Sequence, residues 1–251
     1  MTATEFDDEF LLNYQYAGGN SAPGFNAYAR SLFLSRAQEE LVKDSYRQRS
    51  NTRLEGFEAS ETRRRQLSNL VKQEIILPGQ AVPYNVNFNI SPDSQIFNNL
   101  DLNKVLRIVS EHIDVDPAVC GKKQLPVYAI THDEYSSYAG DPFRKPIKNH
   151  AWRLDTGVFD DINNSLELIT NVPYIRYVLR YIRRPRPIIV ADLSNLGGVA
   201  YSIDGETSVQ TSELIEGFHP EIVTRAVQNA LEAVGDPRFQ THFIAKDNRI
   251  E

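Results

Sequence analysis

Apolar residues recur at helical spacing near both ends of this 251-residue chain, whereas between the ends they alternate or run together in short stretches. Leu34, Ala37 and Leu41 follow one another at intervals of three and four residues, and a longer stripe extends from Ile222 to Val234. Each stripe marks the buried face of an amphipathic helix. No regular alternation of strands and helices appears between them, which argues against a doubly wound parallel sheet. The sequence therefore predicts an α+β fold.

The helix boundaries follow from capping residues. Asn26 is placed to cap a first helix that should end near Tyr46, and Ser60 is placed to cap a second. The second helix would carry a stripe formed by Leu67, Leu70 and Val71. For the last helix, Pro220 stands in the favourable first turn, and Gly235 follows the stripe as a C-terminal cap.

The central stretch has the alternation of half-buried strands. It is clearest from Val82 to Ile90, where apolar residues and prolines or asparagines take turns. A short helix is expected to start near Thr131, and Asp204-Gly205 is expected to form a hairpin turn. Further strands are predicted at 105–113, 125–130, 151–154, 165–170, 174–182, 188–193 and 199–203.

The helices from both ends need partners for their apolar stripes, so the economical arrangement packs them on each other with the strands inserted between them. We expect an N-terminal arm at residues 1–27, a helical part at 28–80 and 217–236, an inserted antiparallel or mixed β region at 81–216, and a C-terminal tail at 237–251. The arm is too apolar for a free solvated tail. It should lie either on its own domain or on a neighbouring subunit, and its aromatic residues are Phe6, Phe10, Tyr14 and Tyr16.

Composition restricts the class of protein. A formal net charge of −6 opposes wholesale binding to a phosphate backbone, which requires clustered cations. Cys120 is the lone cysteine, so an internal disulfide is ruled out and a reducing compartment is favoured. No run of about 18 apolar residues predicts a membrane span, and the acidic N-terminal segment lacks the features of a signal peptide. We expect a soluble protein made in the cytosol.

The familiar catalytic and cofactor motifs are missing from the sequence, and its five histidines are dispersed without metal-ligand spacing. Asp114 and Asp116, or Asp160 and Asp161, leave a metal-dependent hydrolase or nuclease as a minor alternative. Acidic residues in such places more often form turns, and Asn195–Gly198 is also better explained as a turn than as a phosphate loop. No enzyme activity, cofactor or metal is expected.

Arginines gather in one predicted strand and its exit. Arg176, Arg180 and Arg184 share one face of the strand, Ile175, Tyr177, Leu179 and Tyr181 share the other, and Arg186 follows between two prolines. Such a row could stack single-stranded bases, pair with carboxylates of a neighbouring subunit, or form a solvated or internally paired sheet face. The last two interpretations rank level, and a nucleic-acid-binding module ranks behind both.

Three segments carry a family resemblance: Tyr28–Val42, Trp152–Leu154 with Tyr177–Ile189, and Glu213–Val227. In this order they resemble structural proteins of crAss-like and related podovirus-type phages, over about residues 26–234. The first and third segments also resemble the helical part of head-to-tail adaptor proteins, whose subunits form a ring beneath the portal. Ile215 and Gly217-Phe218 depart from the usual pattern of that loop.

This resemblance implies a virion protein without a catalytic site, forming a ring in the tail or the head-to-tail connector. Its expected partners are copies of itself, twelve by family analogy, the portal and neighbouring tail or ring proteins. DNA would pass through without sequence-specific binding, and assembly would take place in the host bacterial cytoplasm. A closed ring needs two different patches on each subunit. The candidates are Phe6, Phe10, Tyr14, Tyr16, Arg176, Arg180, Arg184 and Arg186. We expect a chain lacking residues 1–20 to fold but not to assemble.

Overall fold

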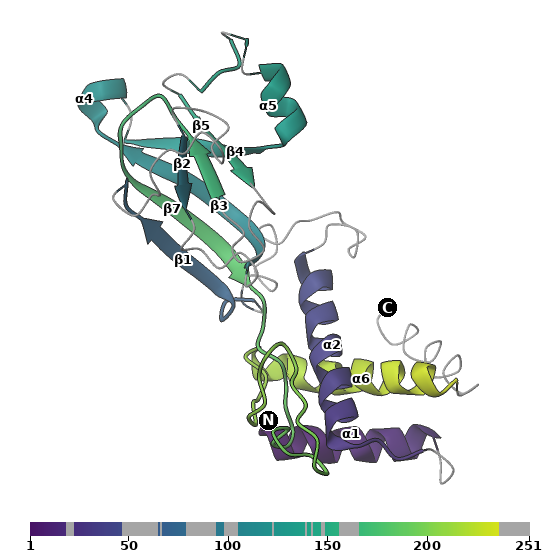
Figure 1. The fold of residues 1–251 in the computed structure, drawn as a ribbon. Helices are drawn as coiled ribbons and strands as arrows, with labels where there is room; N and C mark the ends of the chain where they lie inside the picture. The colour runs from purple at the N-terminus through teal and green to yellow at the C-terminus, as the bar shows by residue number, and fades with distance from the viewer. Residues whose placement is uncertain are drawn as a thin grey trace, which may run out of the picture. The chain divides into compact units, whose positions relative to one another are not determined.

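The computed structural model has two compact units, one formed by both ends of the chain and the other by its middle (Figure 1). The first, here called the helical unit, comprises Met1–Leu70 and Pro185–Glu251, and the second, the β unit, comprises Val71–Arg184. The structure describes residues 1–18, 23–46, 65, 67–78, 94–97, 105–121, 123–138, 140–141, 143–146, 149–155 and 166–235. The fold is α+β, as predicted, and the expected tail at 237–251 lies outside the described residues.

In the helical unit, α6 (His219–Val234) packs against both α1 (Ala3–Gly18) and α2 (Ala27–Tyr46). Pro220 lies in the first turn of α6, and Gly235 ends it with a φ of 71°, a left-handed conformation that glycine adopts without strain. The predicted apolar stripe is buried at Ile222, Val223, Ala226, Val227, Ala230 and Leu231. The prediction of this helix is confirmed at both ends.

The start of α2 also lies where the sequence places it. The side-chain oxygen of Asn26 accepts a hydrogen bond of 2.8 Å from the backbone N–H of Ala29, which satisfies one of the free donors at the helix start. Leu34, Ala37 and Leu41 are buried, so the spacing that predicted this helix does mark its core face.

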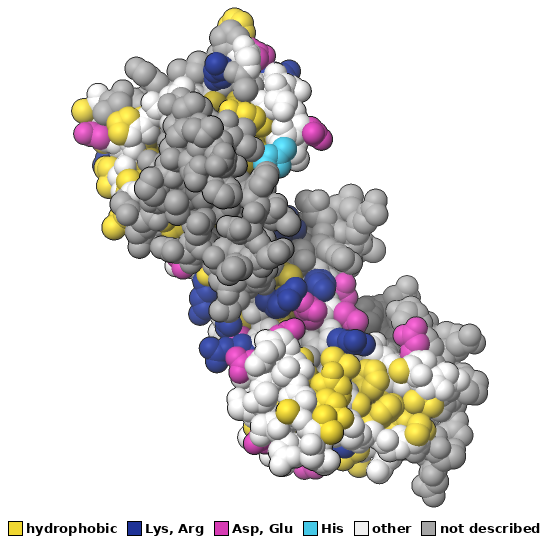
Figure 2. Space-filling view, in the orientation of Figure 1, with side chains coloured by type: hydrophobic (Ala, Val, Ile, Leu, Met, Phe, Trp, Pro, Cys, Tyr) yellow, Lys and Arg dark blue, Asp and Glu magenta, His cyan; other side chains and the backbone are white. Residues whose placement is uncertain are grey.

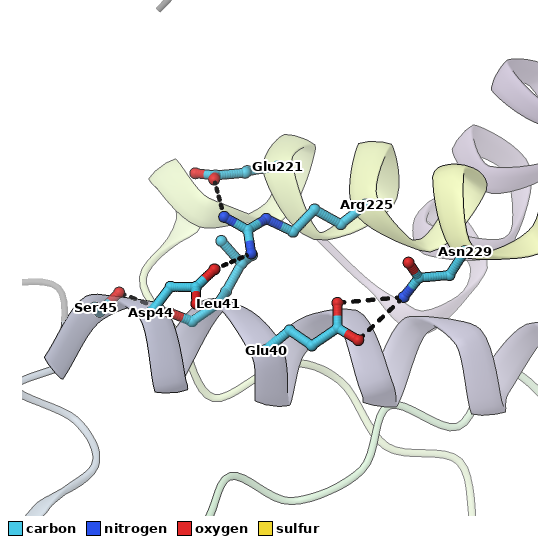
Figure 3. A network of polar contacts seen from close by, with 7 residues as sticks. All are labelled: Glu40, Leu41, Asp44, Ser45, Glu221, Arg225 and Asn229. Atoms are coloured by element: carbon cyan, nitrogen blue, oxygen red, sulfur yellow. Dashed lines mark hydrogen bonds and ion pairs between the residues drawn. The ribbon is translucent and has the colours of Figure 1, made fainter. Parts of the chain in front are cut away.

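Polar side chains join α2 to α6 beside their apolar contact (Figure 3). The Arg225 guanidinium donates to Asp44 at 2.5 Å and to Glu221 at 3.3 Å, and the amide of Asn229 donates to Glu40 at 3.3 Å. The side chains of Asp44 and Glu221 are each 42% exposed, so solvent screening limits each ion pair to less than about 1 kcal/mol. The apolar stripe therefore holds the two helices together, and the ion pairs align them.

The segment expected to be an arm contains α1. Thr2 and Glu5 form a reciprocal capping box at its start, with hydrogen bonds of 2.8 and 3.2 Å between the backbone N–H of each residue and the side chain of the other. Its buried residues recur at intervals of three and four, and they are Ala3, Phe6, Phe10, Tyr14 and Ala17. The N-terminal segment thus contributes a helix to the core of its own unit.

The helix predicted after Ser60 is helical at Arg65, but it ends before the expected stripe of Leu67, Leu70 and Val71. Residues 67–70 form a turn, and Val71 begins strand β1. Leu67 and Leu70 are buried as expected, but β-branched residues follow, among them Ile75 and Ile76, and these favour a strand. Ser60 itself lies outside the described residues.

Within the described part of the β unit, seven strands form one sheet in the order β1-β7-β3-β4-β5-β6-β2. Their bounds are Val71–Ile76 (β1), Ser94–Phe97 (β2), Val105–Val115 (β3), Gln124–Ile130 (β4), Ala151–Asp155 (β5), Leu166–Ile169 (β6) and Tyr174–Arg183 (β7). Only β4 and β5 pair in parallel among these strands, so the sheet is mixed, in agreement with the prediction.

Two short helices lie in the connections of this sheet. α4 (Pro117–Cys120) follows β3, and α5 (His132–Tyr138) follows β4. A parallel pair requires a crossover connection, and α5 belongs to the one that joins β4 to β5. Thr131 and Glu134 cap α5 through reciprocal hydrogen bonds of 2.9 and 3.3 Å, which confirms the helix predicted near Thr131.

One face of the sheet carries the main core of the β unit. Its buried residues are Ile76, Ile113, Val115, Leu125, Val127, Ala151, Leu166, Leu168, Val172, Tyr174, Tyr177 and Leu179. A smaller cluster of Trp152, Leu154 and Ile169 is packed by tyrosines of α5. The buried Arg153 guanidinium lies 3.0 Å from the Glu111 carboxylate, which compensates both charges inside the unit.

The strand predictions fall into three groups. Those at 105–113, 125–130, 151–154, 165–170 and 174–182 are confirmed to within two residues at every end. Those at 188–193 and 199–203 are wrong, because these stretches form only the isolated bridges Ile189–Gln210, Leu196–Val199 and Ile203–Glu206. The strand predicted from Val82 to Ile90 lies outside the described residues.

The wrongly assigned segment lies along α2 instead. Polar side chains at positions i, i+4 and i+7 of that helix form hydrogen bonds with the backbone of this segment. Fewer of the segment's N–H and C=O groups therefore remain for pairing in a sheet. The pairs are Ser31 Oγ with the N–H of Val190 (3.1 Å), Ser35 Oγ with the N–H of Ile188 (3.0 Å), and Gln38 Nε2 with the carbonyl of Arg186 (2.7 Å). Residues 185–216, expected within the inserted β region, therefore belong to the helical unit.

Two tight turns shape this segment further along. Asp204 and Gly205 have φ values of 50° and 83° between the bridged residues Ile203 and Glu206, which confirms the predicted hairpin turn. Gly197 and Gly198, with φ values of 64° and 87°, form a turn of the same kind. The interpretation of Asn195–Gly198 as a turn is therefore confirmed.

Candidate assembly surfaces

The aromatic residues proposed for an interface at the N-terminal end divide between the two faces of α1. Phe6, Phe10 and Tyr14 are buried in the chain itself, whereas Tyr16 is 89% exposed. Rings far apart in the sequence meet here, with centroids 5.0 Å apart for Phe6 and His219 and 5.1 Å apart for Tyr14 and Phe25. Three of the four candidates thus stabilise the helical unit, and only Tyr16 faces outward.

This burial changes what a truncation would do. A chain without residues 1–20 would lose Phe6, Phe10 and Tyr14 from the core and would leave part of the α6 stripe uncovered. Exposing that much apolar surface destabilises the fold. The expectation that such a chain folds normally is therefore incompatible with the structure, and point substitutions are needed to separate folding from assembly.

The outer side of α1 carries apolar and acidic residues together. Leu12, which the sequence analysis did not select, is 69% exposed and lies one turn before Tyr16. Asp8 lies one turn before Leu12, and Glu9 is beside it, both exposed. We call Asp8, Glu9, Leu12 and Tyr16 the acidic α1 face. Helical spacing could have revealed this face, because the apolar residues that recur at intervals of three and four mark one side of the helix and these four residues lie on the other side.

A nearby carboxylate is already occupied. Asp7 accepts two hydrogen bonds from the Arg30 guanidinium, at 2.6 and 2.9 Å, and Arg30 also donates to the carbonyl of Phe25. This bidentate pair fastens α1 to the start of α2. Among the described residues no cation contacts Asp8, so its charge remains available to a partner.

Apolar surface is not restricted to α1. Figure 2 shows hydrophobic side chains gathered on the visible side of the helical unit and scattered over the β unit. In the β unit, Ile75 on strand β1 is 47% exposed, and Ile175 on β7 is exposed as well, although the alternation grouped it with Tyr177 and Leu179. Tyr177 and Leu179 are buried as the alternation predicts.

The arginines of β7 lie on the opposite side of the sheet from its main core. Arg176 and Arg180 share that face, and Ile75 lies on it too, because its partner in the register is Val178, midway between the two arginines. Gln73 and Ser110 are the cross-strand neighbours of Arg180 on β1 and β3. We call Gln73, Ile75, Ser110, Arg176 and Arg180 the arginine face.

The two arginines have different partners. Arg176 bonds the Asp114 carboxylate, with His112 nearby. Burial alone would raise the pKa of Asp114, but the hydrogen bond and charge of Arg176, together with Gln124 and His112, hold that pKa below its ordinary value. Arg180 is exposed, and within the described residues no carboxylate contacts it.

The remaining arginine candidates lie beyond the end of β7. Arg184 is exposed just after β7, at the end of the β unit. Arg186 belongs to the helical unit, where its guanidinium lies 3.6 Å from Glu213 and its backbone N–H donates to the same carboxylate. The predicted row of arginines is therefore divided between two units, and Arg176 and Arg180 are the two that lie within β7 itself.

Two of the four carboxylates considered as metal ligands form other contacts. Asp116 caps α4 by accepting a hydrogen bond of 2.9 Å from the N–H of Ala118, and Asp114 pairs with Arg176. Asp160 and Asp161 lie outside the described residues. In the part of the chain that the structure describes, no three His, Cys, Asp or Glu side chains form a group able to hold a metal ion.

None of the helices that the structure describes combines the length and apolar character needed to cross a bilayer.

Comparison with known proteins places these surfaces in a family context. Residues 1–237 match the model of the family described as phage tail ring protein 3/4. The chain is 33% identical over 238 residues to ring protein 4/5 of Bacteroides phage crAss001, covering 93% of each chain. It is 31% identical over 233 residues to ring protein 3 of the same phage, covering 92% of this chain and 95% of the relative.

Proposed function

This chain belongs to the phage tail ring protein 3/4 family, and we propose that its ring lies where the tail meets the head and surrounds the passage for DNA. Family membership establishes the coarser part: a structural, ring-forming protein of a crAss-like phage tail, and not an enzyme. The position beside the head, the portal and other ring proteins as partners, and twelve copies per ring are our proposals. So is assembly in the host bacterial cytoplasm.

The extent of the match is the observation that supports the ring function, from which the finer proposals start. Both relatives are ring proteins, and each alignment covers more than nine tenths of both chains, so the helical unit and the β unit are both included. A heterologous ring needs two different surfaces on every subunit. The acidic α1 face and the arginine face differ in charge and lie on different units, which supports such a ring.

Charge supports passage of DNA without tight binding. A net charge of −6 per subunit is multiplied by the copies in a ring, and phosphates are repelled by such a wall. The rival function as a nucleic-acid-binding module gains little from the structure. Asp114 neutralises Arg176 and Glu213 lies beside Arg186, so the predicted basic strand offers fewer unpaired cations than its sequence indicates.

Electron microscopy of the purified chain, alone and mixed with the portal and other tail ring proteins, tests this proposal. We expect closed rings with twelve-fold symmetry that stack coaxially with the portal. Phage particles depleted of the chain should package DNA but fail to retain it, because the passage is incomplete. Open filaments, or a ring found only at the far end of the tail, would contradict the proposed position.

A further inference from the structure

We propose that the acidic α1 face of one subunit packs on the arginine face of the next subunit, forming the repeated contact that closes the ring. This inference rests on the proposed ring function and names the two surfaces that carry it. Two different patches on one subunit give a head-to-tail contact, which closes into a ring when the rotation between neighbours allows it. The partner is therefore a second copy of this chain.

The acidic α1 face is built to contact another protein. Asp8, Leu12 and Tyr16 follow one another at i, i+4 and i+8, so they form a line along one side of the helix. Leu12 and Tyr16 are the large apolar side chains that α1 leaves exposed, at 69% and 89%. A tyrosine and a leucine beside two carboxylates offer an apolar anchor with a charged rim, the usual composition of an interface patch.

The arginine face offers the opposite charge and its own apolar position. Arg180 is exposed between Gln73 and Ser110, whose side chains are uncharged and exposed. Ile75 is 47% exposed on the neighbouring strand, level with Val178. Because this is the side of the sheet opposite the main core, a helix from outside could pack on it as helices usually pack on sheets.

The spacing of the two surfaces also fits. Along α1, Leu12 lies roughly 6 Å beyond Asp8, since a helix rises about 1.5 Å per residue. Along the sheet, the level of Ile75 lies about 7 Å from that of Arg180, since two residues of a strand span that length. Placing Asp8 against Arg180 therefore brings Leu12 close to Ile75, and one docking pose satisfies the charged and the apolar pair together.

Other surfaces provide the comparison. Phe143 is an exposed apolar side chain next to the exposed Arg144 and Lys145, so that turn is a second place where an acidic face could bind. Arg144, however, stacks over the Tyr138 ring at 4.5 Å and lies 3.6 Å from Asp141, so its charge is already engaged. Charge complementarity favours Arg180, and Lys145 supplies the matched control.

Charge reversal with rescue tests the contact. Arg180→Glu and Asp8→Arg should each weaken self-association roughly thirtyfold or more, as loss of a close interfacial charge pair does. The double variant should recover most of the wild-type association. Lys145→Glu and Asp133→Arg, which make the same charge changes at exposed positions elsewhere, should assemble like the wild type. Circular dichroism confirms folding, and light scattering over a range of concentrations measures association.

Each alternative result has a definite meaning. If Arg180→Glu forms rings like the wild type, or if the double variant fails to recover, the inference is wrong while the ring function stands. If Lys145→Glu is the variant that stops assembly, the turn at Phe143 is the contact instead. If Arg180→Glu loses only DNA binding, the arginine face serves nucleic acid. A wild-type chain that stays monomeric, alone and with other tail ring proteins, contradicts the proposed function as well.

Discussion

Replacing Phe10 with alanine tests whether α1 is part of the core, on which both the fold and the proposed contact depend. Phe10 is fully buried, and its ring lies parallel to that of Tyr14 with centroids 6.0 Å apart. Truncating a buried phenylalanine removes its apolar contacts and leaves a cavity, which typically costs about 3–5 kcal/mol. We expect Phe10→Ala to lower the free energy of unfolding of the helical unit by about 3–4 kcal/mol, because neighbouring side chains on α6 can relax partly into the cavity.

The assay must report on each unit separately. Each unit has its own core, so unfolding of the whole chain need not be a single transition. Hydrogen exchange resolved along the sequence is suitable: Phe10→Ala should reduce protection throughout α2 and α6 while leaving β3 and β7 unchanged. Guanidinium unfolding followed by circular dichroism then gives the free energy.

Tyr16→Ala is the matched control, because it truncates an aromatic residue on the same helix that is 89% exposed. Exposed positions usually change stability by less than about 0.5 kcal/mol. If Phe10→Ala costs no more than Tyr16→Ala, then α1 does not pack on α6. Equal loss of protection in both units would show that the helical unit does not unfold by itself.

Three other substitutions examine separate features of the helical unit. Burial lowers the pKa of His219 from its ordinary 6.5, so the unfolded chain binds more protons at this residue as the pH falls below that value. In urea titrations, the free energy of unfolding of the wild type should therefore decline below pH 6.5 more steeply than that of His219→Gln. Gly235→Ala places a side chain at a φ of 71° and should cost about 1–2 kcal/mol by thermal unfolding, whereas Gly24→Ala, in open space without a positive φ, should be nearly neutral. Gln38→Ala leaves the carbonyl of Arg186 without its 2.7 Å donor inside the fold and should cost about 1–3 kcal/mol, with hydrogen exchange rising first in residues 186–190.

Local chemistry in the sequence was enough to determine several elements. Asn26 caps the start of α2 and Gly235 ends α6, because a capping side chain and a left-handed glycine act within a few residues of the backbone they satisfy. The Asp204-Gly205 turn is predictable for the same reason. The family resemblance, which rested on three segments of sequence, is confirmed over residues 1–237.

The candidate surfaces could be predicted only in part. Alternation along β7 correctly put Arg176 and Arg180 opposite Tyr177 and Leu179. It could not reveal that Asp114 pairs with Arg176, because that carboxylate comes from β3, 62 residues away in the sequence. Which charges remain available for a partner is therefore a property of strand pairing.

Tertiary structure alone determined where the N-terminal segment and residues 188–193 pack. Phe6 and Phe10 could have faced another subunit, and only the presence of the α6 stripe beside them makes their burial in the same chain favourable. Residues 188–193 have the composition of a strand, but the N–H groups of Ile188 and Val190 donate to Ser35 and Ser31 on α2 and are not available to a neighbouring strand. A sequence specifies which groups must be satisfied, whereas the fold determines which partner comes near enough to satisfy them.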